Sequence, residues 1–205
     1  MINIKDKLII SIVNEKYENI IELAHKYSKI ELRLAQLSLT NQEIINIINA
    51  SELVVITDIA ELKDNNDFHK INLNNVIEKI IIDCPVDKIE NKNLLKYINK
   101  PYVKKIFSYH NNAFSYSIFS YILEKIKTQF NKNDIIKIAV EVKNIDDICD
   151  LLDFLYQNFD YNLILVPLGK EFQQWRKKSL QLGSKYMFCY INNPACDCQL
   201  HYEEY

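Results

Sequence analysis

The sequence contains little glycine and proline, has little net charge and has no long apolar run. Only 2 Gly and 4 Pro occur among 205 residues, which argues against collagen-like sequence, low-complexity linkers and glycine-rich phosphate loops. The 25 Lys and Arg residues nearly balance the 27 Asp and Glu residues, so neither nucleic acid nor an anionic membrane is expected as a partner. Because no apolar stretch reaches about 18 residues, no transmembrane helix is expected.

The N-terminal segment and the cysteines indicate a cytoplasmic setting. Residues 1–6 lack the basic start, apolar stretch and small-residue cleavage site of a signal peptide. A cytoplasmic location is therefore expected, in which the 5 cysteines would be reduced. Cys84, Cys149 and Cys189 lie among apolar neighbours and are expected to be small core residues.

One segment near the C-terminus resembles a metal site. Cys196 and Cys198 form a Cys-x-Cys pair, and His201 follows them. A closed zinc site needs a second pair of ligands, which this segment lacks. A polar loop is therefore the favoured interpretation, and metal binding by the three residues stays open.

Strand-like and helix-like segments alternate along the chain. The eight predicted strands are Lys7–Val13, Lys29–Gln36, Leu53–Ile59, Lys79–Cys84, Lys104–His110, Ile135–Val142, Leu163–Leu168 and Tyr186–Ile191. The predicted helices are Glu15–Tyr27, Asn41–Ala50, Asn74–Glu78, Lys88–Ile98, Ser115–Phe130, Asp146–Phe159 and Glu171–Leu182.

This alternation predicts one α/β domain over residues 1–205, a TIM (β/α)8 barrel. The alternative is a doubly wound sheet, which usually has a glycine-rich first turn, but Val13-Asn14-Glu15-Lys16 contains no glycine. Residues 199–205 leave little room for an eighth helix. The barrel is therefore expected to be trimmed, with that helix missing or very short and one outer face bare or covered by a partner subunit.

Several predicted strands place polar residues on the face that would fill the barrel. Because successive strand residues point to opposite faces, setting the apolar positions against the helices turns Glu31, Arg33 and Asp83 inward, and also His110 and Lys137. Charged side chains are rarely buried unless they are paired, so one interpretation is a Glu31–Arg33 ion pair that plugs the barrel. The other is an active site, because TIM-barrel sites are assembled from the ends of several strands.

Lys137 is the most informative of these residues. Its neighbours Ile136 and Ile138 predict an apolar environment, which disfavours the charged form of an amine. A neutral amine can attack a carbonyl to form a Schiff base. Because consecutive strands of a barrel are neighbours, His110 should lie beside Lys137 and could move protons.

Five blocks occur in the order typical of one enzyme family. They are Ile30-Glu31-Leu32-Arg33-Leu34, Phe107-Ser108-Tyr109-His110-Asn111, Asp134-Ile135-Ile136-Lys137-Ile138-Ala139, then Leu168-Gly169 with Arg176 and Leu182-Gly183-Ser184, and finally Gln199. Together they resemble the type I 3-dehydroquinate dehydratases over nearly the whole chain.

The resemblance implies a hydro-lyase of the shikimate pathway of aromatic amino acid biosynthesis, which converts 3-dehydroquinate to 3-dehydroshikimate. It implies that Lys137 forms an imine with the substrate ketone and that His110 is the general acid and base. The implied substrate-binding residues are Arg176 for the carboxylate, Glu31 and Arg33 for the hydroxyls, and Ser11 and Gln199. The resemblance implies no metal and no other cofactor, and it suggests a homodimer.

The chain departs from the family pattern at Ala35, where the family has an aspartate, and in two longer segments. After Thr57, the family has an arginine where this chain has Ile59, and only Glu61 lies near the place of the acid that assists the histidine. In the last loop, Ala195-Cys196-Asp197-Cys198-Gln199 replaces a Ser-Ala-Pro-Gly-Gln segment. Two alternatives therefore stay open: a weakened or non-catalytic descendant that acts as a binding protein, and another Schiff-base lyase of the class I aldolase type.

Overall fold

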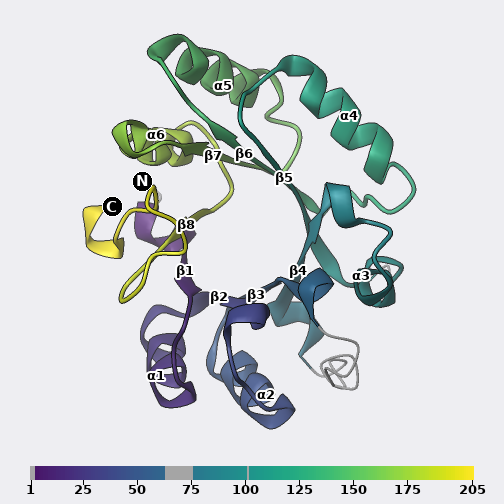
Figure 1. The fold of residues 1–205 in the computed structure, drawn as a ribbon, viewed down its shortest axis with the longest axis vertical. Helices are drawn as coiled ribbons and strands as arrows, with labels where there is room; N and C mark the ends of the chain where they lie inside the picture. The colour runs from purple at the N-terminus through teal and green to yellow at the C-terminus, as the bar shows by residue number, and fades with distance from the viewer. Residues whose placement is uncertain (1–2, 63–75, 101) are drawn as a thin grey trace.

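The structure is a computed structural model that describes residues 3–62, 76–100 and 102–205. In it, eight parallel strands form a barrel in the order β7-β6-β5-β4-β3-β2-β1-β8 (Figure 1). They are β1 (Leu8–Ile12), β2 (Lys29–Arg33), β3 (Leu53–Thr57), β4 (Ile80–Pro85), β5 (Lys104–Asn111), β6 (Ile135–Glu141), β7 (Leu163–Leu168) and β8 (Met187–Cys189).

The sheet closes nearly completely between β7 and β8, the two strands at the ends of this order. The backbone N–H of Lys185, just before β8, donates to the carbonyl of Leu163 in β7 at 2.7 Å. A doubly wound sheet reverses its strand order at a switch point, whereas these strands follow one another around a ring. The predicted TIM barrel is confirmed, and the doubly wound alternative is wrong.

Helices cover the outside of the barrel (Figure 1). In the described residues they are α1 (Tyr17–Tyr27), α2 (Asn41–Ala50), α3 (Lys92–Ile98), α4 (Tyr116–Ile126), α5 (Ile145–Gln157) and α6 (Trp175–Gln181). Helix α2 begins with a capping box, in which Thr40 and Glu43 each bind the other's backbone N–H. Among the described residues, no helix is both long and apolar enough to cross a membrane.

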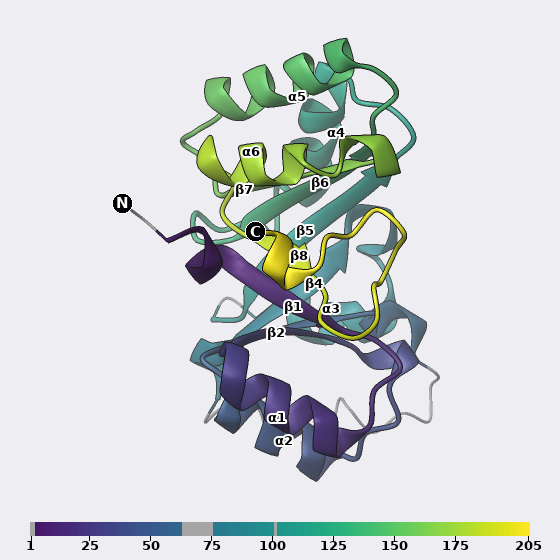
Figure 2. The same cartoon turned by 90° about the vertical axis from the view of Figure 1, so that its left-hand side faces the viewer.

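The expected trimming lies at the C-terminus. After β8, the described chain forms a loop and then a 3-10 turn, Tyr202–Glu204, in place of an eighth α-helix. Figure 2 shows this turn beside the N-terminal segment, where Lys5 pairs with Glu203 at 3.2 Å. The ring of Tyr202 also packs edge-on against Tyr27 at the end of α1, with 4.8 Å between ring centroids. The turn therefore covers part of the outer face that a full helix would cover.

Several predicted boundaries move at the carboxyl ends of the strands. Strand β2 ends at Arg33, earlier than predicted, because a 3-10 turn follows it. Strand β3 ends at Thr57 because Asp58 adopts a left-handed backbone conformation, with a φ of 63°. Of the helix predicted over Asn74–Glu78, residues 74 and 75 lie outside the described residues. The described remainder is not an α-helix, because a 3-10 turn over Ile77–Lys79 precedes β4.

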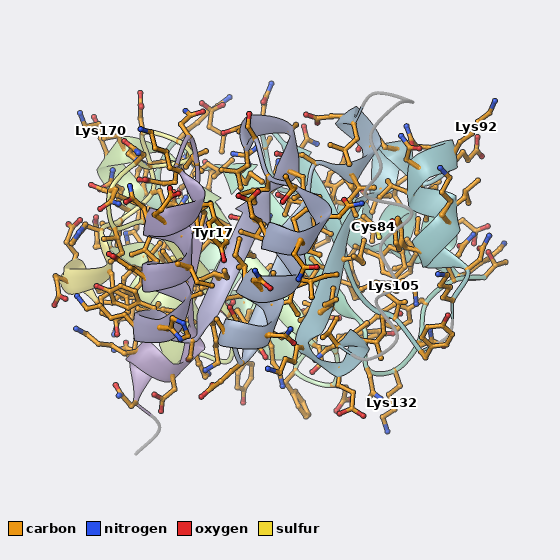
Figure 3. The ribbon with its side chains drawn as sticks, turned by 90° about the horizontal axis from the view of Figure 1, so that it is seen from below. Tyr17, Cys84, Lys92, Lys105, Lys132 and Lys170 are labelled. Atoms are coloured by element: carbon orange, nitrogen blue, oxygen red, sulfur yellow. The ribbon has the colours of Figure 1, made fainter. Side chains whose placement is uncertain are left out.

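The alternation of strand side chains did not predict one buried charged residue, Lys105. Lys105 is fully buried, and its ammonium lies 3.4 Å from the carboxylate of Asp134. Lys105 and Cys84 are both buried and lie within the outline of the molecule in Figure 3, whereas Lys92 and Lys170 project at its edge. Neither Lys105 nor Asp134 lines the cavity inside the barrel. The pair therefore neutralises a buried charge within the barrel wall.

The predictions for the cysteines are partly wrong. Cys84 and Cys189 are buried, as expected, but Cys149 is exposed on α5. Ile148 and Leu151 supply the buried positions of that helix, which leaves the position between them on its outer side. An apolar neighbourhood in sequence does not define a helix face, because helix faces repeat every 3.6 residues.

Candidate active site

A cavity of about 700 Å³ opens at the carboxyl ends of the strands. All of the candidate residues taken from the sequence line it: Ser11, Glu31, Arg33, His110, Lys137, Arg176 and Gln199. They come from β1, β2, β5, β6, α6 and the loop after β8, which meet here because parallel strands end at the same rim of a barrel. The structure therefore brings together the predicted residues in one place.

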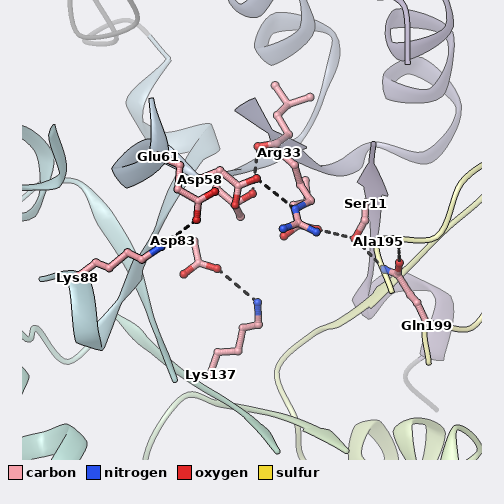
Figure 4. Close-up of polar contacts among 12 residues, drawn as sticks. Ser11, Arg33, Asp58, Glu61, Asp83, Lys88, Lys137, Ala195 and Gln199 are labelled. Carbon is pink, nitrogen blue, oxygen red and sulfur yellow. Dashed lines mark hydrogen bonds and ion pairs between the residues drawn. The ribbon is translucent and has the colours of Figure 1, made fainter. Parts of the chain in front are cut away.

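Lys137 lies deep in this cavity and has two close partners. Its Nζ is 3.4 Å from Oδ2 of Asp83 (Figure 4). The same nitrogen is 4.6 Å from the centre of the Phe188 ring. Lys137 is 8% exposed and Asp83 is 5% exposed. The amine is therefore nearly buried at the cavity wall. The Oδ1 atom of the neighbouring Asp83 is also buried and is left without a hydrogen-bond partner among the described residues.

His110 lies above Lys137 on the neighbouring strand. The register of β5 and β6 sets Ser108 opposite Lys137 and His110 opposite Ala139, so His110 is one inward position nearer the rim. Its side chain retains exposed surface in the cavity mouth. Desolvation by the cavity walls and the positive charge of Lys137 lower the pKa of His110 to about 4. The imidazole is therefore neutral at physiological pH and available as a proton acceptor.

A chain of hydrogen bonds connects β2 to the last loop. The hydroxyl of Ser11 donates to Oε2 of Glu31 at 2.5 Å and accepts from Nε2 of Gln199 at 2.8 Å. Oε1 of Gln199 accepts from the backbone N–H of Ala195 at 2.7 Å (Figure 4). Burial raises the pKa of Glu31, and the charge of Lys137 and the Ser11 hydroxyl oppose that rise. The chain orients the Glu31 carboxylate and holds the loop against the barrel.

The structure does not support a Glu31–Arg33 plug. Among the described residues, no ion pair joins these two side chains. Arg33 instead donates from Nε to Oδ2 of Asp58 at 3.3 Å, and the left-handed conformation of Asp58 directs it to the same rim. Two neighbouring inward charges on one strand therefore have different partners, and both remain at the cavity.

Among the described residues, no hydrogen bond or ion pair joins Glu61 to His110. Glu61 lines the cavity, but it pairs with Lys88 at 3.0 Å on the exposed rim. The negative charges that act on His110 are those of Asp83 and Asp87. Sequence reasoning turned Asp83 inward without including it in the site, and the inward position on β4 was the signal that could have found it.

Arg176 is a buried cation at the cavity wall. It is 2% exposed and donates from Nε to the carbonyl of Pro167 and from Nη2 to Sγ of Cys198, each at 3.2 Å. Among the described residues, no carboxylate forms an ion pair with it. A buried guanidinium without a carboxylate partner is suited to an anionic ligand, because a carboxylate matches its donors and its charge.

The metal-like residues near the C-terminus do not converge. Cys196 and Cys198 lie together, but the ring of His201 packs against Tyr190 and accepts from the backbone N–H of Glu203. Within the described parts of the chain, no group of three or more His, Cys, Asp or Glu residues could hold a metal ion.

A family model of the type I 3-dehydroquinases matches residues 8–204. The chain belongs to the type I 3-dehydroquinase family. Members of this family are lyases that dehydrate 3-dehydroquinate, so the family and the reaction predicted from the sequence are confirmed. Neither a binding protein nor an aldolase-type lyase finds support in this match.

Solved structures of the family have the same fold. The 3-dehydroquinate dehydratase from Aquifex aeolicus VF5 is 20% identical with a TM-score of 0.73, over 96% of this chain and 94% of that chain. The type I enzyme from Clostridium difficile, solved with covalently modified comenic acid, is 18% identical with a TM-score of 0.69, over 97% of this chain and 89% of that chain. A search of curated proteins finds no match to this chain.

Proposed function

We propose that this chain converts 3-dehydroquinate to 3-dehydroshikimate with Lys137 as the nucleophile. The observation that carries the proposal is a nearly buried amine that faces the cavity, one position below His110 on the neighbouring strand. The amine adds to the ketone carbon of the substrate, and loss of water gives a protonated imine. That imine is a covalent electron sink, which weakens the adjacent carbon–hydrogen bond.

His110 carries the proton in the elimination. Its neutral imidazole accepts the proton from the carbon next to the imine, and the electron pair moves into the imine to give an enamine. The enamine then expels the hydroxyl of the next carbon, which leaves as water with the proton of the imidazolium. Hydrolysis of the resulting imine releases the enone product and restores the amine.

Asp83 and Phe188 position the reacting nitrogen. The carboxylate of Asp83, 3.4 Å from Nζ, accepts a hydrogen bond from Lys137 and stabilises the positive charge of the protonated imine. The Phe188 ring, 4.6 Å from Nζ, closes the other side of the amine to water and attracts a cation through its π face. Asp83 is therefore added to the residues expected from the family resemblance.

The remaining side chains hold the substrate. The buried guanidinium of Arg176 has no carboxylate partner among the described residues, and it binds the substrate carboxylate. Glu31 and Arg33 line the same cavity from β2 and bind hydroxyls, while Ser11 and Gln199 keep the Glu31 carboxylate oriented. Together these side chains bind the carboxylate and the hydroxyls of a small polyhydroxylated acid beside Lys137.

Trapping of the imine tests the proposal. Sodium borohydride added together with 3-dehydroquinate should reduce the imine, and peptide mapping should locate the adduct on Lys137. The Lys137→Ala variant should form no adduct and show no turnover in an ultraviolet assay for the enone. Lys127→Ala is the matched control, because Lys127 is exposed on the outer surface and pairs with Glu124. A saturated complex without an adduct on Lys137 would contradict the proposal.

The proposal includes the homodimer and the cytoplasmic location expected from the sequence. Several large apolar side chains on and after the outer helices are exposed, and a second subunit could cover them: Tyr116, Ile145, Tyr156 and Phe159. Sedimentation velocity measures the assembly state directly, and a monomer at assay concentrations would refute the dimer.

A further inference from the structure

The loop after β8 carries two thiols that the proposed reaction does not use. The sulfur atoms of Cys196 and Cys198 are 2.8 Å apart. The backbone N–H of Gln199 donates to the carbonyl of Cys196 at 3.0 Å, and the tight turn that this bond closes sets the two side chains side by side. Sulfur atoms in a disulfide are about 2.0 Å apart, so only a small movement separates this dithiol from a covalent bond.

The pair lies at the entrance of the active-site cavity. Cys196 is exposed and lines the cavity, and Cys198 is half-buried behind it. Nη2 of Arg176 is 3.2 Å from Sγ of Cys198, so a fixed positive charge faces the two sulfurs. Positive charge and exposure together are the surroundings in which thiols become reactive.

The two thiols share a proton unequally. The hydrogen bond from Cys198 and the charge of Arg176 hold the pKa of Cys196 well below its ordinary value. The same hydrogen bond raises the pKa of Cys198. The pair therefore presents a thiolate next to a thiol, the combination that attacks an oxidant and then resolves the product.

The other cysteines differ in ways that make them controls. Burial raises the pKa of Cys84 and of Cys189, and neither side chain reaches the surface. Cys149 is exposed on α5 but does not line the cavity. Reaction with peroxide is therefore expected at Cys196 and Cys198 in the last loop, and not at every exposed cysteine.

We propose that Cys196 and Cys198 form a redox modification site, in which a peroxide converts them to a disulfide within the loop. The Cys196 thiolate attacks one peroxide oxygen, the O–O bond breaks, and a sulfenic acid forms as hydroxide leaves. The hydroxide takes up the proton that the Cys196 thiol had released to solvent and becomes water. The Cys198 thiol then attacks the sulfenic sulfur, and a second water leaves. Overall, two thiols lose two hydrogen atoms and one hydrogen peroxide becomes two waters.

The disulfide acts on the active site through two existing contacts. Arg176 loses its thiol partner, because a disulfide sulfur is a weaker acceptor than a thiol or thiolate. The tightened turn also shifts Gln199, which holds the Ser11–Glu31 hydrogen bond in place. Both changes weaken substrate binding, so KM should rise several-fold on oxidation. This effect on turnover rests on the proposed function, whereas formation of the disulfide does not.

Peptide mapping after treatment with hydrogen peroxide tests the site. The peptide that contains both cysteines should lose two hydrogen atoms, resist alkylation and recover with dithiothreitol. Cys198→Ser should form no such disulfide, and Cys149→Ser should behave like the wild type. Free, alkylatable thiols at both positions after treatment would overturn the proposal, as would oxidation of Cys196 beyond the sulfenic acid without a disulfide.

A kinetic measurement on the same samples tests the regulatory consequence. The oxidised wild type should show a raised KM for 3-dehydroquinate that dithiothreitol restores. An unchanged KM in fully oxidised protein would overturn the link to the active site. Reduced protein without any dehydratase activity would instead refute the proposed function, and peptide mapping would still decide whether the disulfide forms.

Discussion

The Ser11→Ala variant tests whether the Ser11–Glu31–Gln199 chain organises the substrate site. Ser11 supplies a hydrogen bond to a carboxylate that is 6% exposed, and hydrogen bonds to charged groups contribute about 1.5–3 kcal/mol. If this energy is lost from transition-state binding, kcat/KM falls by about 10-fold to about 150-fold. Gln199 loses its acceptor at the same time, which loosens the last loop.

The pH dependence gives the variant a signature that a general loss of structure would not show. The Ser11 hydrogen bond opposes the raised pKa of Glu31, so its removal raises that pKa further. The carboxylate then takes up its proton at a higher pH. The acidic limb of the kcat/KM profile should therefore move to higher pH, measured by the ultraviolet assay for the enone.

Ser51→Ala is the matched control. Ser51 is also a buried serine, but its hydroxyl donates to the carbonyl of Ile47 at the end of α2, and it does not line the cavity. This variant should lose about 1 kcal/mol of stability and keep the wild-type pH profile. If Ser11→Ala shows the same kcat/KM and the same acidic limb as Ser51→Ala, the hydrogen-bonded chain has no part in catalysis.

Two further predictions follow from the buried charges. NMR titration of His110 should give a pKa near 4, and Lys137→Met should raise it because the neighbouring positive charge is gone; a wild-type midpoint near 6.5 would refute the assignment. Because the folded state then binds fewer protons than the unfolded state as the pH falls from 6.5 to about 4, stability should decrease through that window. In urea unfolding, Lys105→Met should cost about 3–5 kcal/mol by leaving the Asp134 carboxylate unpaired. The exposed control Lys127→Met should cost under about 1 kcal/mol, and equal losses would show that burial of the Lys105 pair is unimportant.

Local patterning was sufficient to predict the barrel and the inward-pointing charged residues of its strands, whereas Arg176 and Gln199 were expected only from the family resemblance. Strand side chains alternate between two faces, so apolar residues such as Ile136 and Ile138 identify the outer side, and Lys137 between them must point inward. The same argument turned Glu31 and His110 inward. Because the parallel strands close into a ring, these inward residues meet at the same rim of the barrel.

The partners of those residues required the tertiary structure. Arg33 pairs with Asp58 from the next strand end rather than with Glu31, and Lys137 pairs with Asp83 across β5. The direction of a side chain follows from the backbone of its own strand, which short sequence patterns describe. A partner is decided by the stagger between strands and by the turns at their ends, as at Asp58, and those depend on how the whole barrel closes.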